Sequence, residues 1–308
     1  MKLHYCLLFF CLASCQSEPE NGTAAVGTPV KLRIAPLSSS RHFYDISNET
    51  GIETEVNGKE VETKSRSDVG VSYNTTQDSA GNYIVSMNYD KILVYTKTGD
   101  QETELNADNA SISMNPAEKI LGYLKDAKLI AVLDEKGQTK EVRGYKELGD
   151  KITAGFAAND TYGKAMAQKQ WNEMIRQQLV DDNLKQVFGI FPDSIVRIGQ
   201  EWKTTTRHKE QFNLTVDNTY TLKAVKDSLA TVQVKGKIRS ENGAAGDFNT
   251  DADLNGEQQG TYKINLRTGM PVEVEIASTV EGKMQAMGKE VPLVLRNKIK
   301  IKRRGQND

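Results

Sequence analysis

The C-terminal half of this chain alternates apolar and polar side chains, and this period of two restricts the fold more than any other feature of the sequence. From 214 to 223, one face carries Leu214, Val216, Tyr220 and Leu222, and the other carries threonines, Asp217 and Lys223. Successive side chains of a β-strand point to opposite faces of a sheet, so the alternation predicts half-buried strands. Such strands bury one face of a sheet and leave the other in water.

Turn signals between the alternating segments predict hairpins. The alternation resumes after Lys226-Asp227-Ser228, and a second pair of strands turns at Arg267-Thr268-Gly269. In the N-terminal half, Asn57-Gly58 is a two-residue hairpin signal, and the apolar run 129–133 with the turn residues 134–137 indicates another hairpin. The strands are therefore expected to be antiparallel.

One long segment, from about Asp160 to Phe188, has helical periodicity instead. Its apolar residues recur every three to four positions: Trp171, Ile175, Leu179, Leu184, Val187 and Phe188. A shorter helix is predicted to begin at Pro116 with Asn115 as its cap. We therefore predict an α+β, β-dominated fold in which a curved antiparallel sheet, or an incomplete barrel, packs on one long amphipathic helix.

The N-terminus has the order of a secretory signal. Lys2 precedes an apolar run from Leu3 to Leu12, and Leu12-Ala13-Ser14-Cys15 follows. This run is too short for a membrane-spanning helix, which needs roughly 20 apolar residues. Because the cysteine stands where a bacterial lipoprotein is cut and acylated, we predict lipidation of Cys15. The alternative is an ordinary cleaved signal that ends in cysteine.

This leader divides the chain into three parts. We predict a lipoprotein signal peptide over 1–14, a flexible tether over 15–29 that is poor in large apolar residues, and a single β-rich domain over 30–304. Gln16 follows the cysteine where aspartate is the usual inner-membrane retention signal, so we expect anchoring at the outer membrane. The sequence does not decide between the periplasmic face and the surface face of this membrane.

The segment after the helical region resembles a known family. It places the pair Phe191-Pro192 before a Val-x-x-Gly-x-x-Trp segment that ends at Trp202. This phrase, the hairpin over 134–144, the strand pair over 220–238 and the strand and turn over 260–269 resemble an uncharacterised family of bacterial lipoproteins, domain of unknown function 6263. The resemblance implies a β-rich half-barrel similar to lipoprotein carriers and no known reaction. The structural alternative is that Phe191 and Trp202 simply fill the end of the barrel.

Charge and composition exclude nucleic acid as a partner. The formal net charge is −1 and aromatic residues make up 7% of the chain, which leaves neither an attractive field nor many stacking surfaces. In the concentrated basic segment, 296–304, cationic residues occupy every second position from Arg296 to Lys302. We interpret it as the solvated face of a strand, with a site for lipid headgroups or an acidic partner as the alternative.

Reactive constellations are missing from the sequence after the leader. His42 and His208 have no neighbouring ligand at helical or hairpin spacing, and the common zinc, serine-hydrolase and nucleotide motifs are absent. We therefore expect no catalytic residues, no cofactor and no enzyme activity.

One segment resembles the start of a calcium loop. It places oxygen ligands at alternate positions before Gly256, and the candidate ligands are Asp251, Asp253, Asn255 and Glu257. The twelfth position is Tyr262, so the bidentate glutamate is missing. We therefore predict a weak calcium site, with a polar hairpin connection that binds no metal as the alternative.

Three Asp-Ser-apolar tripeptides begin at Asp78, Asp193 and Asp227. They resemble acceptors of some bacterial O-glycosylation systems. Since Asp and Ser also favour turns, a purely local turn role is the alternative.

These observations favour a lipid-anchored, non-catalytic binding module of the cell envelope whose β-rich half-barrel holds an apolar or extended ligand such as a lipid. Its expected partners are the membrane, through the anchor, and an envelope protein. The alternative is a structural or protein-interaction lipoprotein with a fully packed interior. A cavity of several hundred Å³ would separate the two.

Overall fold

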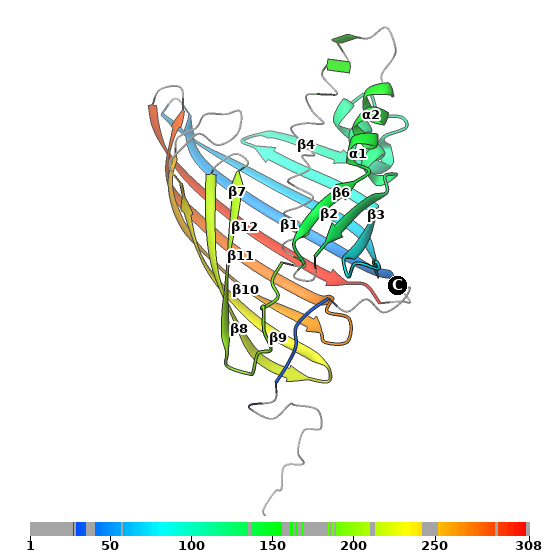
Figure 1. The fold of residues 1–308 in the computed structure, drawn as a ribbon. Helices are drawn as coiled ribbons and strands as arrows, with labels where there is room; N and C mark the ends of the chain where they lie inside the picture. The colour runs from blue at the N-terminus through cyan, green and yellow to red at the C-terminus, as the bar shows by residue number, and fades with distance from the viewer. Residues whose placement is uncertain are drawn as a thin grey trace, which may run out of the picture.

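A computed structural model describes residues 27, 29–34, 41–56, 58–134, 137–155, 161–162, 164–165, 168, 184, 187, 189–209, 213–241, 252–286 and 289–305 of the 308-residue chain. These residues build one twelve-stranded antiparallel sheet that is strongly curved (Figure 1). The concave face of this sheet, called the inner face below, carries the apolar core.

The N-terminal half of the sheet is a run of hairpins with two short helices. Its elements are β1 (Arg41–Val56), β2 (Lys59–Gln77), β3 (Tyr83–Thr98), β4 (Gln101–Asn106), the 3-10 turn η1 (Ala107–Asn109), α1 (Pro116–Lys125), β5 (Leu129–Leu133), β6 (Thr139–Arg143) and α2 (Tyr145–Ala154). The predicted start of α1 is confirmed, since the Asn115 side chain accepts a hydrogen bond from the Ala117 N–H.

The C-terminal half is an uninterrupted meander. Its strands are β7 (Glu201–Lys209), β8 (Asn213–Lys226), β9 (Leu229–Ser240), β10 (Ala252–Asn265), β11 (Pro271–Ala286) and β12 (Lys289–Arg303). The predicted hairpins β8–β9 and β10–β11 are both confirmed by their antiparallel pairing. Asp227 and Ser228 form the first turn with φ of 49° and 65°, the left-handed geometry that suits a tight hairpin.

Pairing between β1 and β12 joins the two halves. The strand order is β6-β5-β3-β2-β1-β12-β11-β10-β9-β8-β7, and β4 pairs with β3 beside this path. Eleven consecutive pairs connect β1 to β12, from Tyr44↔Arg303 to Thr54↔Leu293. The first and last strands therefore lie next to each other in the middle of the sheet (Figure 1).

The two faces of the sheet differ in chemistry. The inner face carries large buried residues such as Tyr44, Leu222 and Ile264. The convex outer face carries cross-strand charge neighbours, including Lys263 with Glu273 at 2.6 Å and Lys300 with Glu275 at 3.7 Å. Arg296, Lys298, Lys300 and Lys302 of β12 are exposed on this outer face, in agreement with the strand interpretation, whereas Arg303 occupies an inward position opposite Tyr44.

The predicted fold class is wrong in its helical part. No long amphipathic helix packs on the sheet among the described residues, in which α1 and α2 span ten residues each. Helix α1 lies beside β3 and β4, and α2 packs next to α1 (Figure 1). Of the predicted helix, Leu184 and Val187 are described, helical and buried. The remaining apolar positions, Trp171, Ile175, Leu179 and Phe188, lie outside the described residues.

The physical reason lies in how a sheet of this size buries its inner face. Helical periodicity identifies an apolar stripe, but it does not determine how much of a sheet that stripe covers. Twelve twisted strands curve over their own inner face, so β1, β8 and β10 contribute to the same apolar cluster, with Tyr44, Tyr220 and Tyr262 as members. Short helices and the segment 29–34 complete the cover.

The segment 29–34 crosses the sheet and is called the N-terminal strap below. Val30 forms a two-way backbone bridge with Val196, and Leu32 and Ile34 are buried. The Tyr83 hydroxyl donates to the Ile34 carbonyl at 2.9 Å. The strap therefore connects β3 to the segment before β7.

Candidate functional site

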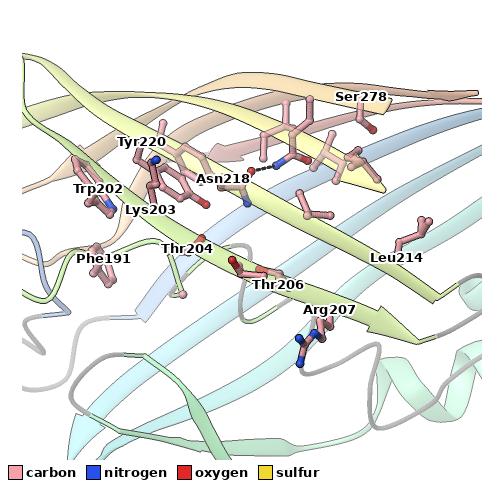
Figure 2. Close-up of a pocket in the computed structure, with 18 of the residues that line it drawn as sticks. Phe191, Trp202, Lys203, Thr204, Thr206, Arg207, Leu214, Asn218, Tyr220 and Ser278 are labelled. Carbon is pink, nitrogen blue, oxygen red and sulfur yellow. Dashed lines mark hydrogen bonds between the residues drawn. The ribbon is translucent and has the colours of Figure 1, made fainter. Parts of the chain in front are cut away.

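A cleft of about 1240 Å³ lies on the inner face of the C-terminal half of the sheet (Figure 2). Strands β7 to β12 supply most of its wall, Thr50 of β1 extends it, and residues 189–194 close one side. Typical small-molecule sites measure roughly 300–1,000 Å³, so the cleft has room for an extended ligand.

Aromatic side chains form one end of the cleft. Trp202 stacks on Tyr220 with ring centroids 5.6 Å apart and an angle of 14°, and Tyr220 meets Tyr262 at 6.1 Å. The Trp202 Nε1–H donates to the Ile190 carbonyl at 2.8 Å, which fixes the segment carrying Phe191 against β7. These contacts agree with the packing role that the sequence allowed for Phe191 and Trp202.

A row of uncharged polar residues crosses the inner face at one register. The ladder pairs Thr204 with Asn218, Asn218 with Gly236, Gly236 with Gln258, Gln258 with Ser278, Ser278 with Asn297, and Asn297 with Thr50. The polar row is defined as the six residues of this ladder that carry polar side chains, and all six line the cleft: Thr204, Asn218, Gln258, Ser278, Asn297 and Thr50.

Side-chain hydrogen bonds hold parts of the polar row in place. The Gln258 Nε2–H donates to Asn218 Oδ1 at 2.6 Å, reaching across Gly236 on the strand between them (Figure 2). The Asn297 Nδ2–H donates to Asn48 Oδ1 at 2.7 Å and to Thr50 Oγ1 at 3.0 Å. A Cβ at position 236 would lie 2.4 Å from Asn218 Oδ1, so glycine makes the first of these bonds possible.

The polar row separates two apolar zones of the cleft. On one side lie the aromatic end, Ile276 and Ile299, which belong to the main core cluster. On the other side lies a second cluster whose cleft-lining members are Val216, Ile238, Val280, Leu214 and Leu295. The cleft is thus apolar at both ends and polar across its middle.

The phenols of the cleft interior stay uncharged, and the cationic side chains of the lining lie at its margin. Burial raises the pKa of Tyr220 and, still further, that of Tyr262, so both phenols are neutral hydrogen-bonding groups at physiological pH. Lys203 and Arg207, both exposed, lie on the edge strand β7 (Figure 2). The site can therefore bind and orient an uncharged chain.

The structure places the predicted calcium residues on a strand. Asp253, Asn255 and Glu257 lie at alternate exposed positions of β10 on the outer face, opposite the cleft. Asp253 pairs with Lys283, whose pKa is raised mainly by its hydrogen bond to Glu290 and to a smaller extent by the charge of Asp253. Asp251 and Cys15 lie outside the described residues, and a calcium site stays an untested prediction.

Other candidate residues are dispersed. Among the described residues, no three His, Cys, Asp or Glu side chains lie close enough together to hold a metal ion. Burial, and secondarily the Arg303 charge, lowers the pKa of His42 to about 4. His208 belongs to β7 and pairs with Leu214. Within the same described part of the chain, every helix is too short or too polar to traverse a bilayer.

The Asp-Ser tripeptides have local structural roles. Asp78 Oδ1 accepts hydrogen bonds from the Ala80 and Asn82 N–H groups, and Asp227-Ser228 is the β8–β9 turn. These two tripeptides therefore have the local turn role, Asp193 lies at the margin of the cleft, and glycosylation of all three stays an untested prediction.

Comparison with known sequences identifies the family. The sequence profile of a family of unknown function, DUF6263, matches residues 80–271, which is more than half of the chain. The chain belongs to the DUF6263 family. The family prediction is confirmed, and the match includes the segment 189–202 and strands β7 to β10 of the cleft. No curated protein matches the DUF6263 chain.

Solved structures resemble this DUF6263 chain only faintly. The translocator domain of autotransporter NalP from Neisseria meningitidis is 6% identical, with 85% of this chain and 88% of that chain covered and a TM-score of 0.21. The COG4313 outer membrane channel from Pseudomonas putida F1 is 8% identical, with 94% and 100% covered and a TM-score of 0.23. OccK7 from Pseudomonas aeruginosa is 5% identical, with 86% and 99% covered and a TM-score of 0.23. TM-scores this low support no inference about fold or function.

The polar row of the DUF6263 chain is absent from the sequence predictions. Asn218, Ser278 and Asn297 occupy inward positions between apolar residues of their strands, so each interrupts the alternation. Such an interruption is a usable signal, because an inward polar residue needs a partner or a ligand. Aligning the interruptions into one row requires the strand register, which the sequence does not supply.

Proposed function

We propose that this protein is a non-catalytic binding module that holds an apolar or extended ligand, such as a lipid, in the cleft on the inner face of its sheet. The observation that carries this proposal is the 1240 Å³ cleft with an apolar zone at each end. Ligand sites are typically clefts lined mainly by apolar and aromatic side chains with a few polar groups. A cleft of this size therefore favours ligand binding over the alternative of a fully packed interior.

The chemistry of the two faces supports the same proposal. Charged residues cover the outer face, and the apolar surface is collected on the inner face. An apolar ligand transferred from water to the cleft gains about 25 cal/mol for each Å² of apolar surface buried. No reactive group is needed for this function.

The proposal includes a place in the cell. A diacylated Cys15 would tether the domain to the outer membrane, where the tether over 15–29 lets it reach a ligand in the membrane or an envelope protein partner. Mass spectrometry of the mature N-terminus, purified from membranes, tests this part. We expect a lipid-modified Cys15, and an unmodified soluble product would contradict the anchor.

Binding itself is tested with N-phenyl-1-naphthylamine, an uncharged dye that fluoresces in apolar sites. The variant Ser278→Phe places a ring in the middle of the cleft, since Ser278 belongs to the lining. The matched control Ala277→Phe places the same ring on the exposed outer face of the same strand. We expect dye binding by the wild type and by Ala277→Phe, and at least tenfold weaker binding by Ser278→Phe.

Two outcomes would count against binding. A wild-type protein that does not enhance dye fluorescence, although circular dichroism shows it folded, would favour the structural or protein-interaction role. Equal dye affinity in Ser278→Phe and Ala277→Phe would place the binding surface outside the cleft.

A further inference from the structure

The polar row lies in an environment where unpaired polar groups are costly. Asn218 is 6% exposed, and its neighbours along β8 on the same face are Val216 and Tyr220. Ser278 lies between Ile276 and Val280, and Asn297 lies between Leu295 and Ile299. When a bound ligand displaces water from the cleft, each polar group of the row left without a partner costs about 1–3 kcal/mol, so the ligand has to supply hydrogen bonds.

Bonds within the protein use only part of the capacity of this row. The amide of Gln258 donates through Nε2, and Asn218 accepts through Oδ1. Asn218 Nδ2, Gln258 Oε1, Ser278 Oγ and Asn297 Oδ1 make no hydrogen bond with any residue that the structure describes. The row therefore offers both donors and acceptors to the cleft.

The groups left over are uncharged. Amides and hydroxyls bind neutral partners such as an amide, an ester or a hydroxyl group, whereas a buried carboxylate or phosphate would call for a cation beside it. The cationic groups of the lining, Lys203 and Arg207, are exposed side chains of the edge strand β7, whereas five of the six members of the row lie on β8, β10, β11, β12 and β1. A charged group has no counter-ion in the middle of the cleft.

Apolar zones lie on both sides of the row. Val216 and Ile238 begin one zone, and Tyr220 and Ile276 begin the other, each two residues from the row along its own strand. Two residues of a strand extend about 6.6 Å, so a bound chain that crosses the row enters an apolar zone within a few bonds on either side.

From this arrangement we infer the ligand class. The ligand of the cleft is an amphiphile that carries an uncharged hydrogen-bonding group, of the amide or ester type, between two apolar arms. Its central group binds the free donors and acceptors of Asn218 and Gln258, and its arms occupy the two apolar zones. This inference rests on the proposed function, since it specifies what the same cleft holds.

Two isomeric amides test the inference by displacement of N-phenyl-1-naphthylamine. N-Hexylhexanamide carries its amide between two apolar arms, and dodecanamide carries the same atoms with the amide at one end. We expect N-hexylhexanamide to bind the wild type about tenfold more tightly, the effect of about two net hydrogen bonds.

A double variant assigns this preference to the row. Asn218→Leu with Gln258→Met replaces both partners of one hydrogen bond by apolar groups of similar shape, a change that costs little stability. We expect it to bind N-hexylhexanamide about tenfold more weakly than the wild type and dodecanamide unchanged. The matched control, Thr219→Val with Gln259→Met, changes the opposite face of the same strands and keeps the wild-type preference.

The outcomes separate the inference from the proposed function. Dye binding without a preference between the isomers, or a preference that survives in the double variant, overturns the inference and leaves the cleft as a general apolar site. No binding of dye or of either amide by folded protein overturns the proposed function, and the inference with it.

Discussion

The Tyr44 hydroxyl donates a hydrogen bond of 2.8 Å to the backbone carbonyl of Pro271, which lies 227 residues further along the chain. Tyr44 belongs to β1 and Pro271 begins β11, so the bond reaches over β12, the strand between them. The Tyr44 side chain is fully buried, and its ring lies 5.6 Å from that of Tyr73 on β2. One side chain thus connects three strands at the junction of the two halves.

Removing the Tyr44 hydroxyl should weaken this junction. In Tyr44→Phe the ring packing stays, while the Pro271 carbonyl loses a partner in a buried place, so we expect the free energy of unfolding in urea to fall by about 1–2 kcal/mol. Tyr162→Phe is the control, because Tyr162 is 78% exposed. Equal stability of the two variants would mean that the bond contributes nothing net.

Gly236 should be needed for the Asn218–Gln258 bond. In Gly236→Ala the new Cβ would lie 2.4 Å from Asn218 Oδ1 and 2.7 Å from Gln258 Cγ, so the two side chains must separate. We expect a loss of about 1–3 kcal/mol in the free energy of unfolding. Gly51→Ala, on β1 with no atom within 4 Å of the added Cβ, is expected to be neutral or slightly stabilising. A neutral Gly236→Ala would show that the row rearranges freely.

Gly269 should be needed for the close contact between the N-terminal strap and the β10–β11 turn, because any side chain at this position would collide with the strap. Its φ is +68°, and a Cβ there would lie 1.9 Å from the Arg33 carbonyl oxygen of the strap. Gly99→Ala is the matched control, since Gly99 has a φ of +56° and open space around it. Both variants place alanine in the left-handed region, which costs about 1–2 kcal/mol, and we expect Gly269→Ala to lose at least about 2 kcal/mol more.

Proteolysis gives a second measurement for the strap. If Gly269→Ala displaces the strap, limited trypsin digestion should cut at Lys31 or Arg33 faster than in the wild type and in Gly99→Ala. Equal rates in the two glycine variants would contradict the close contact.

Local features of this fold follow from the sequence. The Asp227-Ser228 turn, the strands on either side of it and the Asn115 cap of α1 all depend on neighbouring residues, and the structure contains each of them. The cap works because asparagine accepts a hydrogen bond from an unpaired N–H of the first helical turn. Prediction succeeds here because the interactions span only a few residues.

The long-range features of the fold do not follow from the sequence. The pairing of Tyr44 with Arg303 joins two strands from opposite ends of the domain, and no local pattern favours it over other antiparallel partners. The site depends on the same register, since Asn218, Ser278 and Asn297 form one row only when β8 to β12 are aligned. The pattern shows which positions face inward, and the register shows which of them meet.

His42 should make the stability of this protein depend on pH. Burial lowers its pKa from 6.5 to about 4 in the folded protein, with the positive charge of Arg303 as the second cause. The unfolded chain keeps a pKa near 6.5 and takes up a proton first as the pH falls, so protonation favours unfolding. The contribution of His42 to the free energy of unfolding is therefore constant above pH about 7.5 and declines between pH 6.5 and 4.

Urea unfolding at pH 7.5 and at pH 5 measures this effect. We expect the wild type to lose about 2 kcal/mol from this group over the interval, since His42 is protonated at pH 5 only in the unfolded chain. In His42→Gln this loss disappears, whatever the substitution does to stability at pH 7.5, because glutamine does not titrate. Comparison of the two pH dependences removes the contributions of other groups, which both proteins share. An unchanged pH dependence in His42→Gln would show that His42 is protonated equally well in the folded and unfolded states.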